Sequence, residues 1–218
     1  MIDRSAIALH RRSLLSPIWL TLRDTFRGAP PPRRALGVVV EQRRDGQWWP
    51  LPVATQLTAS GHLAFPGLGQ SAQTVGRFVT LRITLTVPGT VTEDAAGHDR
   101  LIRTLVTWNA DRPPPVPVAE IVRFLPGPVY EFGPDVPVVT GHVAAADGSL
   151  TDRARVSVSE VVAGTARVEE VRAGPDGGFR IPVRWSAGQA MVDAALGALA
   201  GSVIVPLPQV QPARITLT

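Results

Sequence analysis

The chain has 218 residues, which is enough for one large or two small domains with a sizeable core. A mean hydropathy of +0.13 and a hydrophobic content of 44% exclude a mainly disordered chain. The 21 prolines and 20 glycines favour short strands and turns over long helices. The lack of cysteine excludes disulfides, thiolate catalysis and zinc sites that need sulfur.

Charge is distributed unevenly along the chain. All 22 basic residues are arginine, and the net charge is +4. Residues 1–44 hold nine arginines and three acids, a net charge of +6, whereas the remainder holds 13 arginines and 15 acids, a net charge of −2. A basic segment can meet nucleic acid, an acidic membrane surface or an acidic protein. Because the sequence has no recognisable nucleic-acid-binding motif, we expect a protein neighbour and no nucleic acid.

The N-terminal arm, residues 1–15, is the first candidate for partner binding. It cannot bury its apolar side alone and would gain by docking on a neighbour, although a frayed terminus is the alternative. Arginines interrupt the arm before any hydrophobic region of signal length, so no secretory signal is expected. No apolar run approaches 18 residues, so no membrane span is expected either. The candidate residues of the arm are Ile7, Leu9, Arg11, Arg12, Leu14 and Leu15.

Residues 16–124 show the pattern of a β-sandwich with about eight strands. Apolar residues alternate most clearly in 16–23 and 77–87, as expected of strands with one buried face. The three successive valines at 38–40 instead predict burial on both faces, or the centre of a strand. An Asp45-Gly46 hairpin turn then leads into Trp48 and Trp49.

These two tryptophans are the second candidate for partner binding. Adjacent residues on a strand point to opposite faces, so at least one of them must face solvent or a partner. The alternative is that a tryptophan only caps the edge of the sandwich beside the neighbouring prolines.

Proline-rich segments predict the domain boundary. The stretch 111–118 has no helix capacity and is expected to act as a semi-rigid connector. We place the boundary within 112–137, with a linker at 125–137 and a second β-sandwich at 138–218; residues 118–125 are expected to be the last strand of the first sandwich or part of the connection. Two consecutive sandwiches predict that under about a tenth of the residues are helical, far less than in an average protein.

The second sandwich is predicted from alternating residues and glycine-marked turns. Asp147-Gly148 and Asp176-Gly177 favour tight turns, and Phe179 is expected to point into the core. Residues 186–201 are rich in alanine and leucine, so a helix is a rival there by propensity. Glycines break that segment, and we expect strands near 190–196 and 202–207, with 213–217 closing the sheet.

This C-terminal pattern resembles the carboxypeptidase regulatory-like domain, a transthyretin-like β-sandwich. The resemblance covers the last third of the chain and implies a fold, since such modules act as spacers, adaptors and binding domains. It rests on a VxGxV strand, a DG turn, an AxVxV strand and a DGxF strand. The matching residues are Val139, Gly141, Val143, Asp147, Gly148, Ala154, Val156, Val158, Asp176, Gly177 and Phe179.

The sequence contains no catalytic signature. The four histidines lack metal-ligand spacing, and there is no nucleophile elbow, P-loop lysine or dinucleotide fingerprint. Two carboxylate pairs occur, Glu93-Asp94 and Glu169-Glu170, but adjacent acids on a strand point to opposite faces and cannot cooperate as acid and base. We therefore expect no enzyme activity, no bound metal and no cofactor.

The whole chain also resembles accessory or cap-type proteins of contractile injection systems, the phage-tail-like particles. The residues that carry this resemblance are WLTLRDTFRGAP, the DG hairpin, SGHLAFPGLG and the RFLPGPVYEF stretch before VxGxV. It implies a structural or adaptor protein that binds copies of itself or other particle proteins. Such a protein would assemble in the cytoplasm and could be released with the particle.

A secreted or surface carbohydrate-binding module is the alternative function. In that case Trp48, Trp49 and Trp108 would be the stacking platforms for sugar rings. The missing secretory signal favours the first function over this one.

Overall fold

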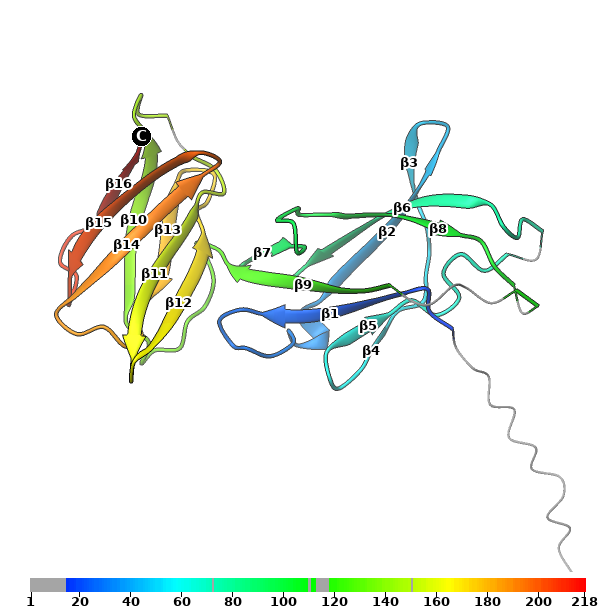
Figure 1. Cartoon of the computed structure of the whole chain (residues 1–218), viewed down its shortest axis with the longest axis horizontal. Coiled ribbons are helices and arrows are strands. Elements are labelled where there is room, and N and C mark those ends of the chain that lie inside the picture. The colour runs from blue at the N-terminus through cyan, green and yellow to red at the C-terminus, as the bar shows by residue number, and fades with distance from the viewer. Residues whose placement is uncertain (1–14, 72, 110, 113–117, 150) are drawn as a thin grey trace, which may run out of the picture.

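The chain folds as an all-β protein. The computed structural model describes residues 15–71, 73–109, 111–112, 118–149 and 151–218. The helical structure within these residues is one three-residue 3-10 helix, η2 (Arg33–Ala35). Strands form four sheets around two separate hydrophobic cores, and these two halves lie side by side along the long axis of the molecule (Figure 1).

Two sheets enclose the core of the first half. The first has the order β4-β5-β1-β9-β7, with β1 parallel to β9 and the other neighbours antiparallel. The second has the order β3-β2-β6-β8, all antiparallel. The strands of the first sheet are β4 (Gln56–Leu57), β5 (His62–Ala64), β1 (Ile18–Asp24), β9 (Val118–Pro126) and β7 (Thr90–Glu93). Those of the second are β3 (Gln47–Pro50), β2 (Gly37–Arg44), β6 (Phe78–Thr86) and β8 (Leu101–Val106).

The alternation that predicted the first core is confirmed in β1 and β6. Every second residue of these strands is buried between the two sheets: Ile18, Leu20, Leu22, Leu81, Ile83 and Leu85. Of the two alternatives for the valines of β2, burial on both faces is wrong. Val40 is buried, but Val39 is more than half exposed because the outer face of this sheet lies open.

The second half also consists of two sheets around a core. One has the order β13-β10-β16, and the other has the order β12-β11-β14-β15. The strands of the first are β13 (Gly178–Pro182), β10 (Val138–Ala145) and β16 (Ala213–Leu217). Those of the second are β12 (Thr165–Arg172), β11 (Arg155–Val162), β14 (Gln189–Leu196) and β15 (Leu199–Pro206).

Residues 186–201 are not helical, so the strands predicted there are confirmed and the helix is wrong. Strands β14 and β15 pair along their full length around a turn at Gly197, which has a positive φ of 62°. Alternate residues of β14 face the core, namely Ala190, Val192 and Ala194. Burial of this period-two face overrides the helix propensity of alanine.

Two glycines allow the backbone to pack closely in this core. Gly177 ends the predicted Asp-Gly turn with φ of 72°, and a Cβ there would collide with the carbonyl oxygen of Val143. A Cβ on Gly141 would collide with the carbonyl oxygen of Ala213 and the ring of Phe179. Both positions need glycine because atoms of a neighbouring strand occupy the space that a side chain would fill.

The proline-rich stretch 111–118 leads from β8 to β9, which are strands of the same half. Residues 113–117 of it lie outside the described part. Since β9 pairs with β1 over seven residues, the expectation that this stretch joins the two modules is wrong. The chain passes between the halves at 127–137, between β9 and β10.

Candidate functional site

Most of the predicted arm residues lie outside the described part of the chain: Ile7, Leu9, Arg11, Arg12 and Leu14. Leu15 is described, and its side chain is exposed. Its carbonyl oxygen accepts a hydrogen bond from the backbone N–H of Gly67 at 3.1 Å. Leu15 is thus joined through its backbone to the first half.

The two adjacent tryptophans lie on β3, in a hairpin that projects from its sheet (Figure 1). Trp49 is more than half exposed. The ring of Trp48 lies over the guanidinium of Arg82, 4.6 Å from its carbon to the ring centroid. Arg82 in turn donates two hydrogen bonds to Glu41, at 2.6 and 2.7 Å. This pair of hydrogen bonds lowers the pKa of Glu41 and raises the pKa of Arg82.

Trp108 cannot act as a stacking platform, which corrects that part of the carbohydrate alternative. Its side chain is buried, and its indole Nε1 donates a hydrogen bond to the carbonyl oxygen of Leu68 at 2.7 Å. Among the described residues, the tryptophans with exposed side chains are Trp49 and Trp185.

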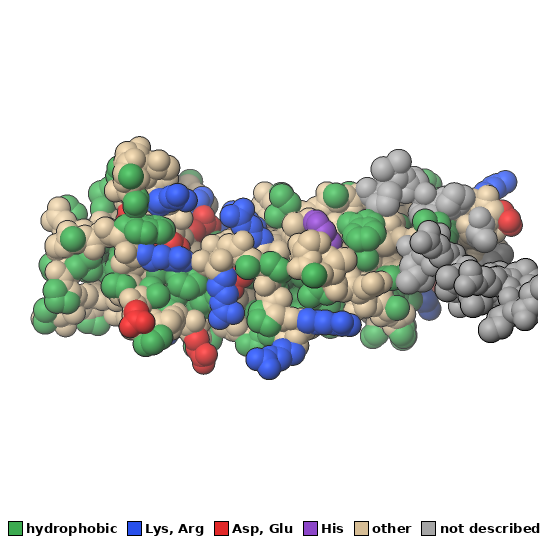
Figure 2. Space-filling view, turned by 90° about the horizontal axis from the view of Figure 1, so that it is seen from below, with side chains coloured by type: hydrophobic (Ala, Val, Ile, Leu, Met, Phe, Trp, Pro, Cys, Tyr) green, Lys and Arg blue, Asp and Glu red, His purple; other side chains and the backbone are tan. Residues whose placement is uncertain are grey.

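The two halves meet through an ion-pair cluster centred on Glu93. Glu93 ends β7 in the first half and is only 5% exposed. Arg172, at the end of β12 in the second half, donates to both carboxylate oxygens of Glu93, through Nη2 at 2.8 Å and also through Nε. Arg123 of β9 lies 3.5 Å from the same carboxylate, and Glu170 lies 3.4 Å from Arg172. The side chains of Glu93, Arg172 and Glu170 are largely removed from water, so each of these charges depends on its partners, whereas Arg123 is more exposed. Arginine side chains are visible along the middle of the molecule, where the halves meet (Figure 2).

A second set of contacts joins the halves through aromatic rings. The guanidinium of Arg184 lies 3.8 Å from the ring centroid of Phe26, donates to the Phe26 carbonyl oxygen at 2.6 Å and pairs with Glu169 at 3.0 Å. The rings of Phe26, Tyr130 and Phe132 pack edge-on or tilted, with centroids 4.9–5.7 Å apart. The connecting segment 127–137 is therefore packed against the first half through its aromatic residues.

Tyr130 fixes this connecting segment further. Its hydroxyl donates a hydrogen bond to Asp24 Oδ2 at 2.7 Å, and both side chains are buried. Burial and the carboxylate of Asp24 raise the pKa of Tyr130, so the phenol stays protonated and remains a donor. Asp24 also accepts from the backbone N–H groups of Phe26 and Arg27, both at 3.0 Å, which holds the turn after β1.

Each adjacent acid pair serves two different partners, as expected for residues on opposite faces. Glu170 pairs with Arg155 at 2.7 Å, while Glu169 points inward toward Arg184. Burial raises the pKa of Glu169; the nearby carboxylate of Glu160 adds to this effect and Arg184 opposes it. Among the described residues, no three His, Asp or Glu side chains come together as a metal site would require.

Asp94 holds the turn between β7 and β8, and this gives a pH-dependent prediction. Burial raises the pKa of Asp94, but hydrogen bonds from the backbone of His98 and Ala96 and from the His98 ring outweigh burial, so its pKa lies below the ordinary 3.8. The resulting stability is present above the ordinary pKa and is lost as the pH falls through the lower, folded-state pKa. We expect Asp94→Ala to lower the free energy of unfolding by about 1 kcal/mol at neutral pH, because two N–H groups lose a charged acceptor.

Asp94→Asn is the matched variant because its side-chain oxygen still accepts from both N–H groups. Urea unfolding at about pH 6 and about pH 3 should show the gap between the natural protein and Asp94→Asn narrowing at the lower pH. A gap of equal size at both values would contradict the assignment of Asp94.

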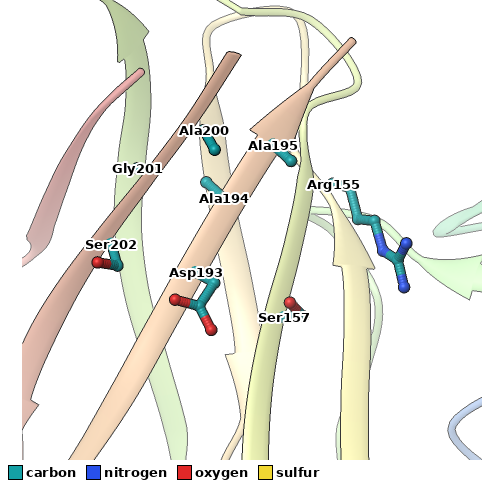
Figure 3. A pocket seen from close by; sticks show the side chains of 8 residues that line it. All are labelled: Arg155, Ser157, Asp193, Ala194, Ala195, Ala200, Gly201 and Ser202. Carbon is teal, nitrogen blue, oxygen red and sulfur yellow. The ribbon is translucent and has the colours of Figure 1, made fainter. Parts of the chain in front are cut away.

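Shallow hollows lie beside the junction and on the second half. One, of about 340 Å³, lies between the halves and is lined by Glu93, Asp99, Arg153 and Arg172 among others. Another, of about 500 Å³, lies on the outer face of β11, β14 and β15, and its lining side chains are small apart from Arg155 (Figure 3).

The sequence matches no protein-family model, and none of the curated proteins searched matches it. No helix within the described residues has the length and apolar character to cross a membrane.

Proposed function

We propose that this protein is a non-enzymatic structural or adaptor component of a large assembly. The observation that carries the proposal is the junction, where Glu93, Arg172, Tyr130 and Asp24 are all largely buried and paired between segments far apart in the sequence. Flexible tethering of two modules would need only a linker. A packed, charge-paired junction instead holds two β units at a fixed angle, and this suits a component that must present two surfaces to two neighbours.

The assembly we propose is a phage-tail-like contractile injection system, with this protein at a cap, baseplate or accessory position. Support comes from the sequence resemblance of the whole chain to accessory or cap-type proteins of such particles and of 138–218 to the regulatory-like domain. The protein would assemble in the cytoplasm with copies of itself or with other particle proteins, and could leave the cell with the particle.

Particle incorporation tests this function directly. The full-length protein would be produced together with the tube, sheath and baseplate proteins of such a particle, and intact particles would be separated by sedimentation and viewed in negative stain. The protein should co-sediment with particles, and particles from cells that lack it should be incomplete or fewer. Normal particles without it, combined with glycan binding that Trp49→Ala abolishes, would instead establish the carbohydrate-binding alternative.

Deleting residues 1–14 should leave both β units folded and abolish incorporation. Leu15 is kept because its carbonyl oxygen bonds to Gly67. The expected loss follows from the arm's leucine and isoleucine side chains, which would each stabilise a docked state by roughly 1.5–3 kcal/mol if fully covered. Arg11 and Arg12 would add mainly steering toward an acidic neighbour. Sedimentation of the full-length and shortened proteins side by side checks this, and equal incorporation of both would remove the arm from the proposal.

A further inference from the structure

A hollow of about 420 Å³ opens at the end of the first β-sandwich that lies away from the second half (Figure 1). Its walls come from the end of β2, the start of β6, the end of β8 and the loop 67–71. Lining residues such as Leu81 and Leu105 belong to the first core, so the hollow leads into that core. The junction lies at the opposite end, where β1 ends at Asp24.

The floor of this hollow is apolar and incompletely covered. Three of its side chains are buried members of the first core, and three others pack against the core while they remain partly exposed. An enclosed apolar cavity of about 150 Å³ is enough for a benzene-sized group, so there is room here for an aliphatic side chain. The buried side chains are Leu68, Leu81 and Leu105, and the partly exposed ones are Leu51, Val53 and Val79.

Polar groups of the lining pair with one another, which favours an apolar occupant. Arg44 donates from Nη2 to Oε1 of Gln42 at 2.9 Å, and the hydroxyls of Ser71 and Thr74 share a hydrogen bond of 2.7 Å. The hydroxyl of Thr107 donates to the carbonyl oxygen of Thr74. A polar ligand would compete with these bonds, whereas an aliphatic side chain leaves them intact.

The first described residues are fixed at the edge of the hollow. The carbonyl oxygen of Leu15 accepts a hydrogen bond from the N–H of Gly67 at 3.1 Å, and Gly67 lines the hollow. Ser16 is buried, and its hydroxyl oxygen accepts a hydrogen bond from the N–H of Phe65 at 2.9 Å. Consecutive Cα atoms are about 3.8 Å apart, so residue 14 follows directly at this edge.

The alternation of β1 indicates which side Leu14 would take. Successive side chains of an extended chain point to opposite faces. The core-facing residues of β1 have even numbers, and the buried Ser16 shares their parity. Leu15 has the other parity, and it is 40% exposed. If the extended course continues by one residue, Leu14 comes to the core side, where the hollow opens between the sheets.

We propose that Leu14 of the same chain fills this hollow and closes the open end of the first core. The place where the arm starts selects this occupant over the arm of a second copy, because a tether of one residue gives a far higher effective concentration. The inference goes beyond the proposed function and does not depend on it. An extended chain spans at most about 3.3–3.6 Å per residue, so Ile7 could still reach a neighbour roughly 25 Å from Leu15.

Thiol labelling of the full-length protein tests this seat, because the natural chain has no cysteine. Leu14→Cys should react with a water-soluble maleimide at least about tenfold more slowly than Leu15→Cys, since a thiol in the hollow reacts only when the arm opens. In urea, where the chain is unfolded, the two variants should react at the same rate. Equal rates in the folded protein would overturn the inference.

Two further measurements identify the occupant and the seat. The slow labelling of Leu14→Cys should persist through about a hundredfold dilution, whereas its loss on dilution would mean that a second copy supplies the arm, and the inference would fail. Adding Val53→Trp, which fills the hollow from its wall, should speed the labelling at least about fivefold. Val39→Trp is the matched control, since Val39 is 52% exposed and lies outside the hollow, and it should change nothing.

Thermal melts would show that these variants are folded. Labelling that stays slow when Val53→Trp is present would place Leu14 elsewhere and overturn the inference as well. None of these results would touch the proposed function, which depends on particle incorporation.

Discussion

Replacing Glu93 with alanine should destabilise the protein by about 3–5 kcal/mol, because it leaves the buried guanidinium of Arg172 without its main counter-charge. Arg172 is affected most, because its side chain is only 12% exposed and it donates to both carboxylate oxygens of Glu93. Arg123 loses the same partner. Urea unfolding followed by tryptophan fluorescence would measure the change.

The same variant should loosen the two halves relative to each other. Glu93 and Arg172 belong to different halves, so their pairing helps to hold the angle between them. Small-angle scattering should show a larger radius of gyration for Glu93→Ala at temperatures where both cores remain folded. Glu41→Ala is the matched control, since its bidentate pair with Arg82 lies within one sheet of the first half. It should cost far less and leave the scattering curve unchanged. Equal effects of the two variants would show that the junction has no special role.

The strands were predictable because one face of each is buried in a core. In β1 and β6 the leucines and isoleucines recur at every second position, and these are the residues that are buried. The turn at Asp176-Gly177 was predictable for a local reason as well, since Gly177 has a positive φ. The two-residue repeat of a strand and the residue types of a tight turn are both properties of short segments, so they can be recognised in a single sequence.

Predictions failed where burial depends on the next layer of structure. The valines of β2 fit the pattern of a strand buried on both faces, yet Val39 is more than half exposed. Sequence hydrophobicity does not say which faces a neighbouring sheet will reach. The alanine-rich segment of β14 and β15 was ambiguous for a related reason, because propensity is weak compared with core packing.

The junction gave no signal in the sequence. Glu93 and Arg172 are 79 positions apart, and Tyr130 and Asp24 are 106 apart. The residues around a buried, paired charge do not differ in type from those around an exposed one, so the local sequence cannot identify it. Which side chains share the outer face of β11 and β14 is likewise known only from the strand register, because a slip of one residue would send every side chain to the other face.

Phe179→Ala should cost about 3–5 kcal/mol of unfolding free energy in the full-length protein. The ring of Phe179 is only 2% exposed, and it packs so closely over Gly141 that a methyl group there would collide with it. Truncation removes the ring's apolar contacts and opens a cavity beside backbone that cannot collapse, since β10 is held by β13 on one side and by β16 on the other.

Phe78→Ala provides the matched control in the same chain. Phe78 starts β6 and is 79% exposed, so the same truncation should change the stability by less than about 0.5 kcal/mol. Urea unfolding of the three proteins would give both values under identical conditions. A cost below about 1 kcal/mol for Phe179→Ala would mean that the ring does not fill the second core. Phe179 would then have to point outward, and the pairing of β13 with β10 would have to shift by one residue, which would expose Ile181 and bury Arg180 in its place.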